Sequence, residues 1–411
     1  MKNIYAALVL VTLSTFAFGS QPRKVLLIGI DGCRSDAFQQ ANTPHLDGLI
    51  TNGLFTYDSW HVGITWSGPS WSAILTGVEW QKHGVTSNAF TGSNYGQYNL
   101  FPALAKQVKP ALKTAEVVEW DPLADNMDHS GWDTKIKVPD GGTVATADSG
   151  IAQLQDPDLD ALFVYFDKVD LAGHSTTFSP TNPTYISAIE SVDSAVGRVL
   201  TALHARPNYA SEDWLVLVIT DHGGKSYFHG GNSNEERHIW WIASGSAIDP
   251  HQYFNANDPG TYNCHANTVY DSTCVNAAYL HNAPLGRDIA VTALHHLIYT
   301  SGIRPENKAE WNLDGISWLK GGVGIRDVSA STSLKIFPNP ATQITSIWFE
   351  NTANEKVLAN VYDGNGREVA AGITYASANK IHIDVSALPK GNYVAGIQVG
   401  EKHLARAFTV E

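Results

Sequence analysis

The chain has 411 residues, a formal net charge of −13 and a hydrophobic content of 43%. The apolar content excludes a disordered protein, because it is enough for a large buried core. The acidic balance, without any basic run, argues against a nucleic-acid-binding patch, since such a patch neutralises phosphates with Lys and Arg. We therefore expect a folded protein of two or three domains.

Residues 1–20 have the pattern of a secretory signal peptide. Lys2 is followed by an apolar run over residues 4–18 and then by the small residues Gly19 and Ser20. The run is short for a membrane anchor, which is the alternative interpretation. We expect this segment to be removed on export, and we predict no stable membrane span elsewhere in the chain.

Apolar runs and apolar spacing predict the elements of the first large domain, residues 21–319. Nearly continuous runs, typical of strands buried on both faces of a parallel sheet, cover residues 24–30, 161–166, 214–220 and 238–243. Helical spacing covers residues 183–205 and 288–299. Strands that alternate with helices predict an α/β fold with a mostly parallel sheet flanked by helices.

The composition changes twice after the last of these strands. Residues 250–285 are rich in Asn, Pro, Gly and Tyr, and we predict an inserted loop or lid there. A Gly-rich linker over residues 320–333 precedes short alternating runs, which predict a small β-sandwich over residues 334–411.

The three cysteines have different predicted roles. Cys264 and Cys274 lie in the predicted loop, and an exported protein can oxidise them to a disulfide, although the sequence does not decide whether they are bridged. Cys33 follows a predicted buried strand, so an inert buried thiol is favoured over a metal ligand.

Acids and histidines follow three of the predicted strands. They are Asp31, Asp170, His174, Asp221, His222 and His229. Because functional sites of open α/β sheets lie at the carboxyl ends of the strands, we expect these side chains to converge. Mixed carboxylate and imidazole ligands favour divalent ions such as Zn²⁺, with Mn²⁺ as an alternative.

A hydroxyl-rich segment precedes a predicted helix that continues through Ile74 and Leu75. It contains Thr65, Ser67, Ser70 and Ser72. One interpretation is a polar turn or helix cap. The other is a nucleophilic hydroxyl at a helix N-terminus, where backbone N–H groups and the helix dipole favour a phosphate.

Several motifs together resemble the alkaline phosphatase superfamily, most closely its type I phosphodiesterase/nucleotide pyrophosphatase branch. They are D-G-x-R-x-D at 31–36, T-P-H-L-D at 43–47, S-G-P-S…L-T-G at 67–77, K-H-G-V at 82–85, D-x-x-G-H at 170–174 and D-H-G-G at 221–224. The resemblance covers residues 24–318 and implies an alkaline phosphatase-like fold. It implies a hydrolase acting on a small phosphoester, a phosphodiester or a nucleotide pyrophosphate, as the expected activity.

The resemblance also implies a site with two zinc ions and a covalent intermediate. One ion is assigned to Asp31, Ser67, Asp221 and His222, and the other to Asp170, His174 and His229. Ser67 is the expected nucleophile, forming a phosphoseryl intermediate, with Thr65 as the alternative. His265 and His281 are alternatives to His229. Ser70 stands where relatives have an Asn that helps to hold the phosphate, and Trp66, Trp71 and Tyr227 are candidates for lining a leaving-group pocket.

Three other functions remain open at this point. A phosphomonoesterase would use the same site. A sulfatase needs Cys or Ser in the pattern C/S-x-P-x-R, but Trp71 stands where that Arg belongs. A non-catalytic surface protein would have no reason to retain the ligand set.

The C-terminal segment carries a second resemblance. The sequences L-K-I-F-P-N-P-A at 334–341 and K-G-N-Y-V at 390–394 are similar to the C-terminal sorting domain of the type IX secretion system. The alternative is a carbohydrate-binding or adhesion β-domain. The resemblance implies handling by the type IX secretion machinery and a secreted or cell-surface location, reached through the periplasm.

Overall fold

A computed structural model of the chain describes residues 21–255, 257–265, 269–320, 334–349, 351, 357–363, 368–399 and 402–411. The expected signal peptide, residues 1–20, and residues 321–333 of the expected linker lie outside this part. Within the described ranges, no helix combines the length and apolar character needed to cross a bilayer.

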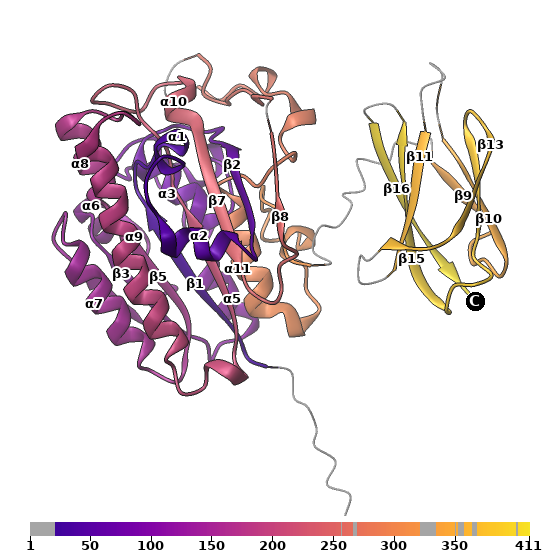
Figure 1. Cartoon of the computed structure of the whole chain (residues 1–411), viewed down its shortest axis with the longest axis horizontal. Helices are drawn as coiled ribbons and strands as arrows, with labels where there is room; N and C mark the ends of the chain where they lie inside the picture. The colour runs from indigo at the N-terminus through magenta and orange to yellow at the C-terminus, as the bar shows by residue number, and fades with distance from the viewer. Residues whose placement is uncertain are drawn as a thin grey trace, which may run out of the picture.

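Eight strands form one sheet, in which segments from distant parts of the sequence are neighbours. In spatial order they are β4 (Thr134–Lys137), β3 (Lys113–Val118), β5 (Leu159–Phe166), β1 (Arg23–Ile30), β6 (Asp213–Ile219), β7 (His238–Ser244), β2 (Leu54–Trp60) and β8 (His251–Gln252). Within this described sheet, only β7 runs against the others. Helices cover both faces (Figure 1), so the predicted mostly parallel α/β fold is confirmed.

The two faces of the sheet bury separate hydrophobic cores, because successive side chains of a strand point to opposite faces. In β1, Val25 and Leu27 pack in one core, and Leu26 and Ile28 pack in the other. Helices α3 (Ser67–Thr76), α5 (Phe101–Val108) and α11 (Asp288–Ile298) contribute to the first core. Helices α2 (Pro44–Ile50), α7 (Thr143–Leu154) and α9 (Pro183–His204) contribute to the second.

Shorter helices occupy the connections between the strands. They are α1 (Ser35–Phe38), α4 (Trp80–His83), α6 (Asp121–Asn126), α8 (Lys168–Thr176) and α10 (Asn234–Arg237). Figure 1 places α8 and α10 toward the same upper edge of the sheet. That edge is where the parallel strands β1, β5 and β6 end.

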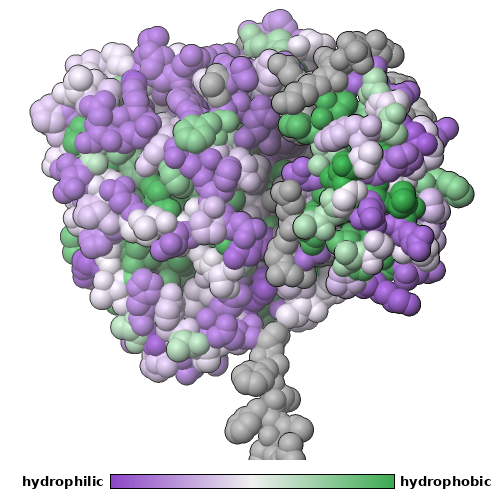
Figure 2. Space-filling model, turned by 45° about the vertical axis from the view of Figure 1, so that its right-hand side comes forward, coloured by the Kyte–Doolittle hydropathy of each residue, from purple (hydrophilic) through white to green (hydrophobic). Residues whose placement is uncertain are grey.

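The C-terminal part contains two antiparallel sheets of four strands each. One has the order β13 (Gly372–Ser377), β14 (Lys380–Asp384), β10 (Ile344–Trp348) and β9 (Lys335–Phe337). The other has the order β12 (Glu368–Val369), β11 (Val357–Asp363), β15 (Gly391–Val399) and β16 (Lys402–Val410). Their inner faces share a core that includes Ile347, Ile381 and Val361, which confirms the predicted β-sandwich. Figure 2 shows hydrophobic side chains on the surface of this part too. Phe337 and Tyr375 are exposed in this domain.

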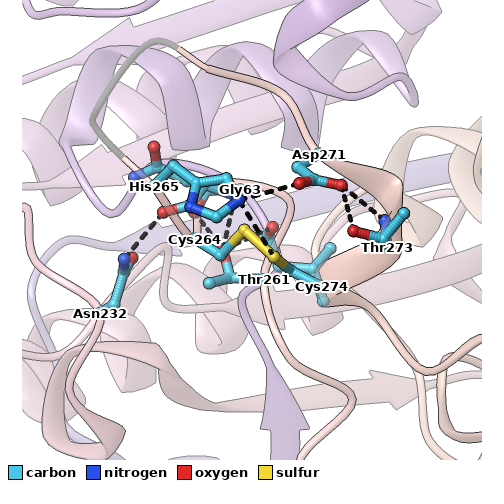
Figure 3. Close-up of a disulfide and its surroundings, with 10 residues drawn as sticks. Gly63, Asn232, Thr261, Cys264, His265, Asp271, Thr273 and Cys274 are labelled. Atoms are coloured by element: carbon cyan, nitrogen blue, oxygen red, sulfur yellow. Dashed lines mark hydrogen bonds and ion pairs between the residues drawn. A yellow bond between two sulfur atoms is a disulfide. The ribbon is translucent and has the colours of Figure 1, made fainter.

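A disulfide joins Cys264 to Cys274 in the segment predicted as a loop (Figure 3). The segment is tied to the chain before α3, because Thr261 Oγ1 donates a hydrogen bond to the carbonyl oxygen of Val62 at 2.9 Å. It is also tied to the loop after β6 through Asn232, whose Nδ2 donates to the carbonyl oxygen of Asn263 at 2.8 Å. The disulfide segment therefore braces two loops at the carboxyl edge of the sheet.

Candidate metal centre

Three adjacent strands deliver the predicted acids to one place. Strands β5, β1 and β6 are neighbours in the sheet. Asp31 follows β1, Asp221 follows β6, and Asp170 lies in α8, which begins just after β5. The expected convergence of these carboxylates at the carboxyl edge is therefore observed in the structure.

Asp31, Asp221 and His222 form the first ligand group, in which one ligand atom from each lies within 4.8 Å of the others. His222 Nε2 is 3.5 Å from Asp31 Oδ1 and 3.3 Å from Asp221 Oδ2. The other oxygen of Asp221 accepts the backbone N–H of Gly32 at 3.1 Å, which orients the carboxylate.

Asp170, His222 and His229 form the second ligand group by the same distance measure. His229 Nε2 is 3.7 Å from Asp170 Oδ1. His174 adjoins this group, because its Nε2 is 3.2 Å from Asp170 Oδ2 and 3.1 Å from His229 Nε2. His222 thus lies between the two groups, and all six predicted acids and histidines are brought together.

The structure also places the alternatives for the third histidine. His265 contacts Asp271 in the disulfide segment, with 2.9 Å between Nε2 and Oδ2. Among the residues that the structure describes, neither His265 nor His281 is a member of the first or the second ligand group. The contacts of His229 therefore favour it as the third histidine of the second ligand group.

Backbone carbonyls fix the orientation of the three imidazoles. The Nδ1 atoms of His174, His222 and His229 contact the carbonyl oxygens of Tyr227, Gly223 and Thr65, each at 2.8 Å. A carbonyl accepts only, so Nδ1 carries the proton and the lone pair of Nε2 faces the carboxylates. This outer hydrogen bond is the usual arrangement of histidines that bind metal ions.

Three buried carboxylate oxygens indicate that metal ions fit this site. Asp31 Oδ1, Asp170 Oδ1 and Asp221 Oδ2 have no hydrogen-bond partner among the residues that the structure describes. Each of these oxygens faces the Nε2 atom of His222 or His229. Buried acceptors of this kind are rare unless a water or ion satisfies them. The donor set therefore fits divalent cations at both ligand groups.

Burial controls the protonation of the site in the metal-free protein. Burial raises the pKa of Asp31 to about 8, and the Asp170 carboxylate adds to the increase. Burial also raises the pKa of Asp221, with Asp31 as the second cause. For His222 and His229, burial lowers the pKa to about 3. These two imidazoles are therefore neutral, as metal binding requires, whereas the hydrogen bond to Asp170 raises the pKa of His174.

Ser67 is the hydroxyl of its segment that contacts the ligands. It is the first residue of α3, and its Oγ is 3.1 Å from His222 Nε2. Thr65, the alternative nucleophile, donates its hydroxyl to the carbonyl oxygen of Gly231 at 2.6 Å. Ser70 donates to the carbonyl oxygen of Ile64 at 3.1 Å. These hydroxyls are thus engaged elsewhere.

Trp71 and Tyr165 hold Asp31 in place. Trp71 Nε1 donates to Asp31 Oδ2 at 2.8 Å, and the Tyr165 hydroxyl donates to the same oxygen. Gly29 permits this contact, since a Cβ atom there would lie 2.4 Å from the Trp71 ring. Trp71 is completely buried, so it does not line a leaving-group pocket. The sequence offered no signal for Tyr165, which reads only as part of a buried strand.

Asn88 is a neighbour of Ser67 that the sequence did not predict. Its Oδ1 accepts the backbone N–H of Gly68 at 2.8 Å, so its amide lies against the first turn of α3. Ser70, expected to stand in for an Asn in holding phosphate, points to Ile64 instead. Arg34 pairs with Asp36 and donates to backbone carbonyls, which is a structural role.

Comparison with protein families agrees with the motifs. A model of the type I phosphodiesterase / nucleotide pyrophosphatase family matches residues 25–138 and 114–238, just over half of the chain. The chain belongs to this family. The matched residues include all six predicted acids and histidines. Residues 335–411 match a second model, described as a secretion system C-terminal sorting domain.

Two human relatives belong to the same group of enzymes. The chain is 24% identical over 236 residues to ectonucleotide pyrophosphatase/phosphodiesterase family member 7, covering 50% of this chain and 48% of the relative. It is 23% identical over 222 residues to bis(5′-adenosyl)-triphosphatase ENPP4, covering 50% and 48%. The chain thus spans about half the length of the curated relatives it matches.

A solved structure supports the fold. A 2-O GAG sulfatase superposes with a TM-score of 0.51 at 13% identity, covering 94% of this chain and 83% of the sulfatase. At this identity the likeness concerns the fold alone. The residue that a sulfatase pattern requires as Arg is Trp71, whose indole holds Asp31.

Proposed function

We propose that the chain hydrolyses phosphodiester or nucleotide pyrophosphate bonds, with Ser67 as the nucleophile and divalent metal ions at the two ligand groups. The observation that carries this proposal is the contact of Ser67 Oγ with His222 Nε2 at 3.1 Å, because His222 belongs to both groups. A nucleophile at this point meets a phosphorus atom that both groups can hold. Membership of the family supports the reaction class.

The residues of the chain prepare Ser67 for attack. His222 presents an unprotonated Nε2 because its Nδ1–H is held by the carbonyl oxygen of Gly223. In the metal-free protein this Nε2 accepts the hydrogen of the Ser67 hydroxyl; with a metal ion bound it would be a ligand instead, and the ion would lower the pKa of the hydroxyl so that its proton leaves to solvent. The N-terminus of α3 places the positive end of the helix dipole beside Ser67, which favours an anion there. Ser67 then bonds to phosphorus as the leaving group departs, and water releases the phosphoseryl intermediate.

Asp31, Asp221 and His222 would hold one metal ion beside Ser67, and Asp170, His174 and His229 would hold the other. When bound, such ions supply Lewis acidity that stabilises the negative charge of the reacting oxygens. Mixed carboxylate and imidazole ligands make Zn²⁺ our choice, with Mn²⁺ as the alternative. The hydrogen bonds from Trp71 and Tyr165 keep Asp31 oriented for this role.

The sorting-domain match suggests where the reaction takes place. Residues 335–411 are expected to be handled by the type IX secretion machinery. We propose that the protein passes through the periplasm and works outside the cell or on its surface. The disulfide between Cys264 and Cys274 is in keeping with an oxidising environment.

A substrate panel separates this proposal from a phosphomonoesterase on the same site. We expect kcat/KM for bis(4-nitrophenyl) phosphate to exceed that for 4-nitrophenyl phosphate by about tenfold or more. The reason is that a diester carries one negative charge fewer than a monoester, so the site has less charge to stabilise. The zinc-loaded, full-length chain is assayed with both compounds, which release the same chromophore. Faster turnover of the monoester would replace the proposal with the phosphomonoesterase.

A further inference from the structure

The disulfide segment contains a further cluster of residue types that bind metal ions, and it shares no residue with the two ligand groups. Cys264, His265, Asp271 and Cys274 each offer one ligand atom, and these four atoms lie within 4.8 Å of one another. Figure 3 shows the imidazole of His265 in contact with both Asp271 and Cys274. A disulfide by itself requires neither an imidazole nor a carboxylate beside its sulfur atoms.

The spacing of these atoms matches that of ligands around one zinc ion. His265 Nε2 is 2.9 Å from Asp271 Oδ2 and 4.0 Å from Cys274 Sγ. In a tetrahedral site with metal–ligand bonds of about 2.0–2.3 Å, neighbouring ligand atoms lie roughly 3.3–3.8 Å apart. The two contacts of His265 lie on either side of this range, so small side-chain movements bring all three atoms to it.

Asp271 is held by hydrogen bonds that leave one of its oxygens for a ligand. Its Oδ1 accepts the backbone N–H of Thr273 at 2.8 Å and the Thr273 hydroxyl at 2.6 Å. These bonds cap the turn η2 (Ser272–Cys274), but they do not explain why Oδ2 faces His265. Outer hydrogen bonds of this kind orient the carboxylates that bind metal ions. Because η2 also carries Cys274, one turn positions two of the four candidate ligands.

The oxidation state of the two cysteines decides whether this cluster can bind an ion. Zinc takes thiolates as ligands, and the sulfur atoms of a disulfide are not thiolates. A dithiol reductant opens the bond between Cys264 and Cys274: the cysteines take up two electrons and two protons, and the reductant becomes a disulfide. Binding of Zn²⁺ then displaces both thiol protons to solvent.

We propose that the reduced chain binds a zinc ion through Cys264, His265, Asp271 and Cys274, and that formation of the disulfide releases this ion. The reducing interior of the cell, where the chain is made, keeps the thiols available for zinc. After export, a disulfide-carrying oxidant accepts the electron pair of the two thiolates together with two protons and becomes a dithiol, and Zn²⁺ leaves. This site does not depend on the proposed function.

The ion and the disulfide close the same segment, so both preserve its contacts with the neighbouring loops. Thr261 bonds to the carbonyl oxygen of Val62, and the carbonyl oxygen of Asn263 accepts from Asn232. Thr261 and Asn263 lie within three residues of Cys264. The reduced, zinc-bound chain therefore keeps the brace at the carboxyl edge of the sheet before the disulfide forms.

Titration with Co²⁺, which takes the place of Zn²⁺, tests the site. The full-length chain is reduced with dithiothreitol, freed of reductant by gel filtration under nitrogen, and compared with the oxidised chain. A thiolate bound to Co²⁺ gives a sulfur-to-cobalt charge-transfer band in the near ultraviolet. The two ligand groups contain no cysteine, so ions bound there give no such band. We expect the band in the reduced chain alone, together with one more zinc ion per reduced chain than per oxidised chain in metal analysis.

Variants of the two other ligands separate the four-residue site from a simple pair of thiols. We expect His265→Ala and Asp271→Asn each to weaken Co²⁺ binding at the thiolate site by about tenfold or more, because even the loss of an outer partner of a ligand costs about 10- to 100-fold. Asn at position 271 can still accept the Thr273 N–H, which preserves the turn. Cys274→Ser should remove the band.

His251→Ala is the matched control, since His251 is also an exposed histidine of the predicted loop but belongs to no ligand group in the described part of the chain. It should bind Co²⁺ as the wild-type chain does. A reduced wild-type chain without the charge-transfer band would refute the zinc site. Wild-type affinity in both His265→Ala and Asp271→Asn would refute it too, because the thiols alone would then hold the ion. Neither result bears on phosphoester turnover, which tests the proposed function separately.

Discussion

Replacing Ser67 by alanine is expected to lower kcat by about three orders of magnitude or more, since the variant lacks the proposed nucleophile. Zinc content should stay near the wild-type level, because Asp31, Asp221 and His222 remain in place. The overall fold should persist, as the lost hydrogen bond to His222 contributes only about 1 kcal/mol. Turnover of a phosphodiester and the zinc content of the same preparation are the measurements.

Ser70→Ala and Thr65→Ala are the controls for this prediction. Ser70 has the same side chain as Ser67 and lies in the same helix, but its hydroxyl donates a hydrogen bond to the carbonyl oxygen of Ile64. The hydroxyl of Thr65 donates a hydrogen bond to the carbonyl oxygen of Gly231. We expect both variants to keep most of the wild-type kcat. An active Ser67→Ala variant together with an inactive Thr65→Ala variant would move the nucleophile to Thr65.

Removing the metal ions should abolish turnover and destabilise the protein, and the loss of stability should grow as the pH rises. The raised pKa values of Asp31 and Asp221 mean that the metal-free folded state holds protons that the unfolded chain has released. Stability of the metal-free protein therefore decreases with increasing pH in this range. The lowered pKa values of His222 and His229 act in the opposite direction only below about 6.5, the ordinary pKa of histidine.

Between pH 6.5 and pH 8 the site protons of the metal-free folded protein are held by the carboxylates and by His174, whose pKa is raised by its hydrogen bond to Asp170, and both contributions lower stability as the pH rises. Ions at a hundredfold excess over Kd stabilise the folded state by about 2.7 kcal/mol per site. We expect the difference in Tm between zinc-loaded and chelator-treated protein to be larger at pH 8 than at pH 6.5. A difference that stays constant or shrinks over this window would mean that these carboxylates do not bind the ions.

An Asp170→Asn variant should lose affinity for one of the two ions.

The elements that place the ligands were predictable because they are buried on both sides. Strands β1, β5 and β6 are continuous apolar runs, and the rule that sites lie at the carboxyl ends of strands was sufficient to group Asp31, Asp170 and Asp221. Strand β3, with the sequence K-T-A-E-V-V, was not predicted, because its polar side chains, including the buried Glu116, conceal its apolar character.

Side-chain contacts across the sheet were less predictable. The sequence left His229, His265 and His281 as alternatives, since only the path of the loop after β6 decides which of them reaches Asp170. Trp71 was predicted to line a pocket. Because Gly29 has no side chain, there is space for the indole to lie inside the protein, where it donates to Asp31. Asn88 lies 20 residues beyond Gly68 in the chain, and only the folded loop brings the two into contact.

Ser67, placed between two metal-ligand groups, is expected to form a bond to phosphorus during the reaction. The most direct test is to mix the zinc-loaded, full-length chain with a phosphodiester, quench the reaction in acid within one turnover and map the adduct by peptide mass spectrometry. We predict an adduct on Ser67 that carries the phosphoryl group and the ester group retained from the diester. An adduct on Thr65, or complete hydrolysis in a Ser67→Ala variant, would show that Ser67 is not the nucleophile.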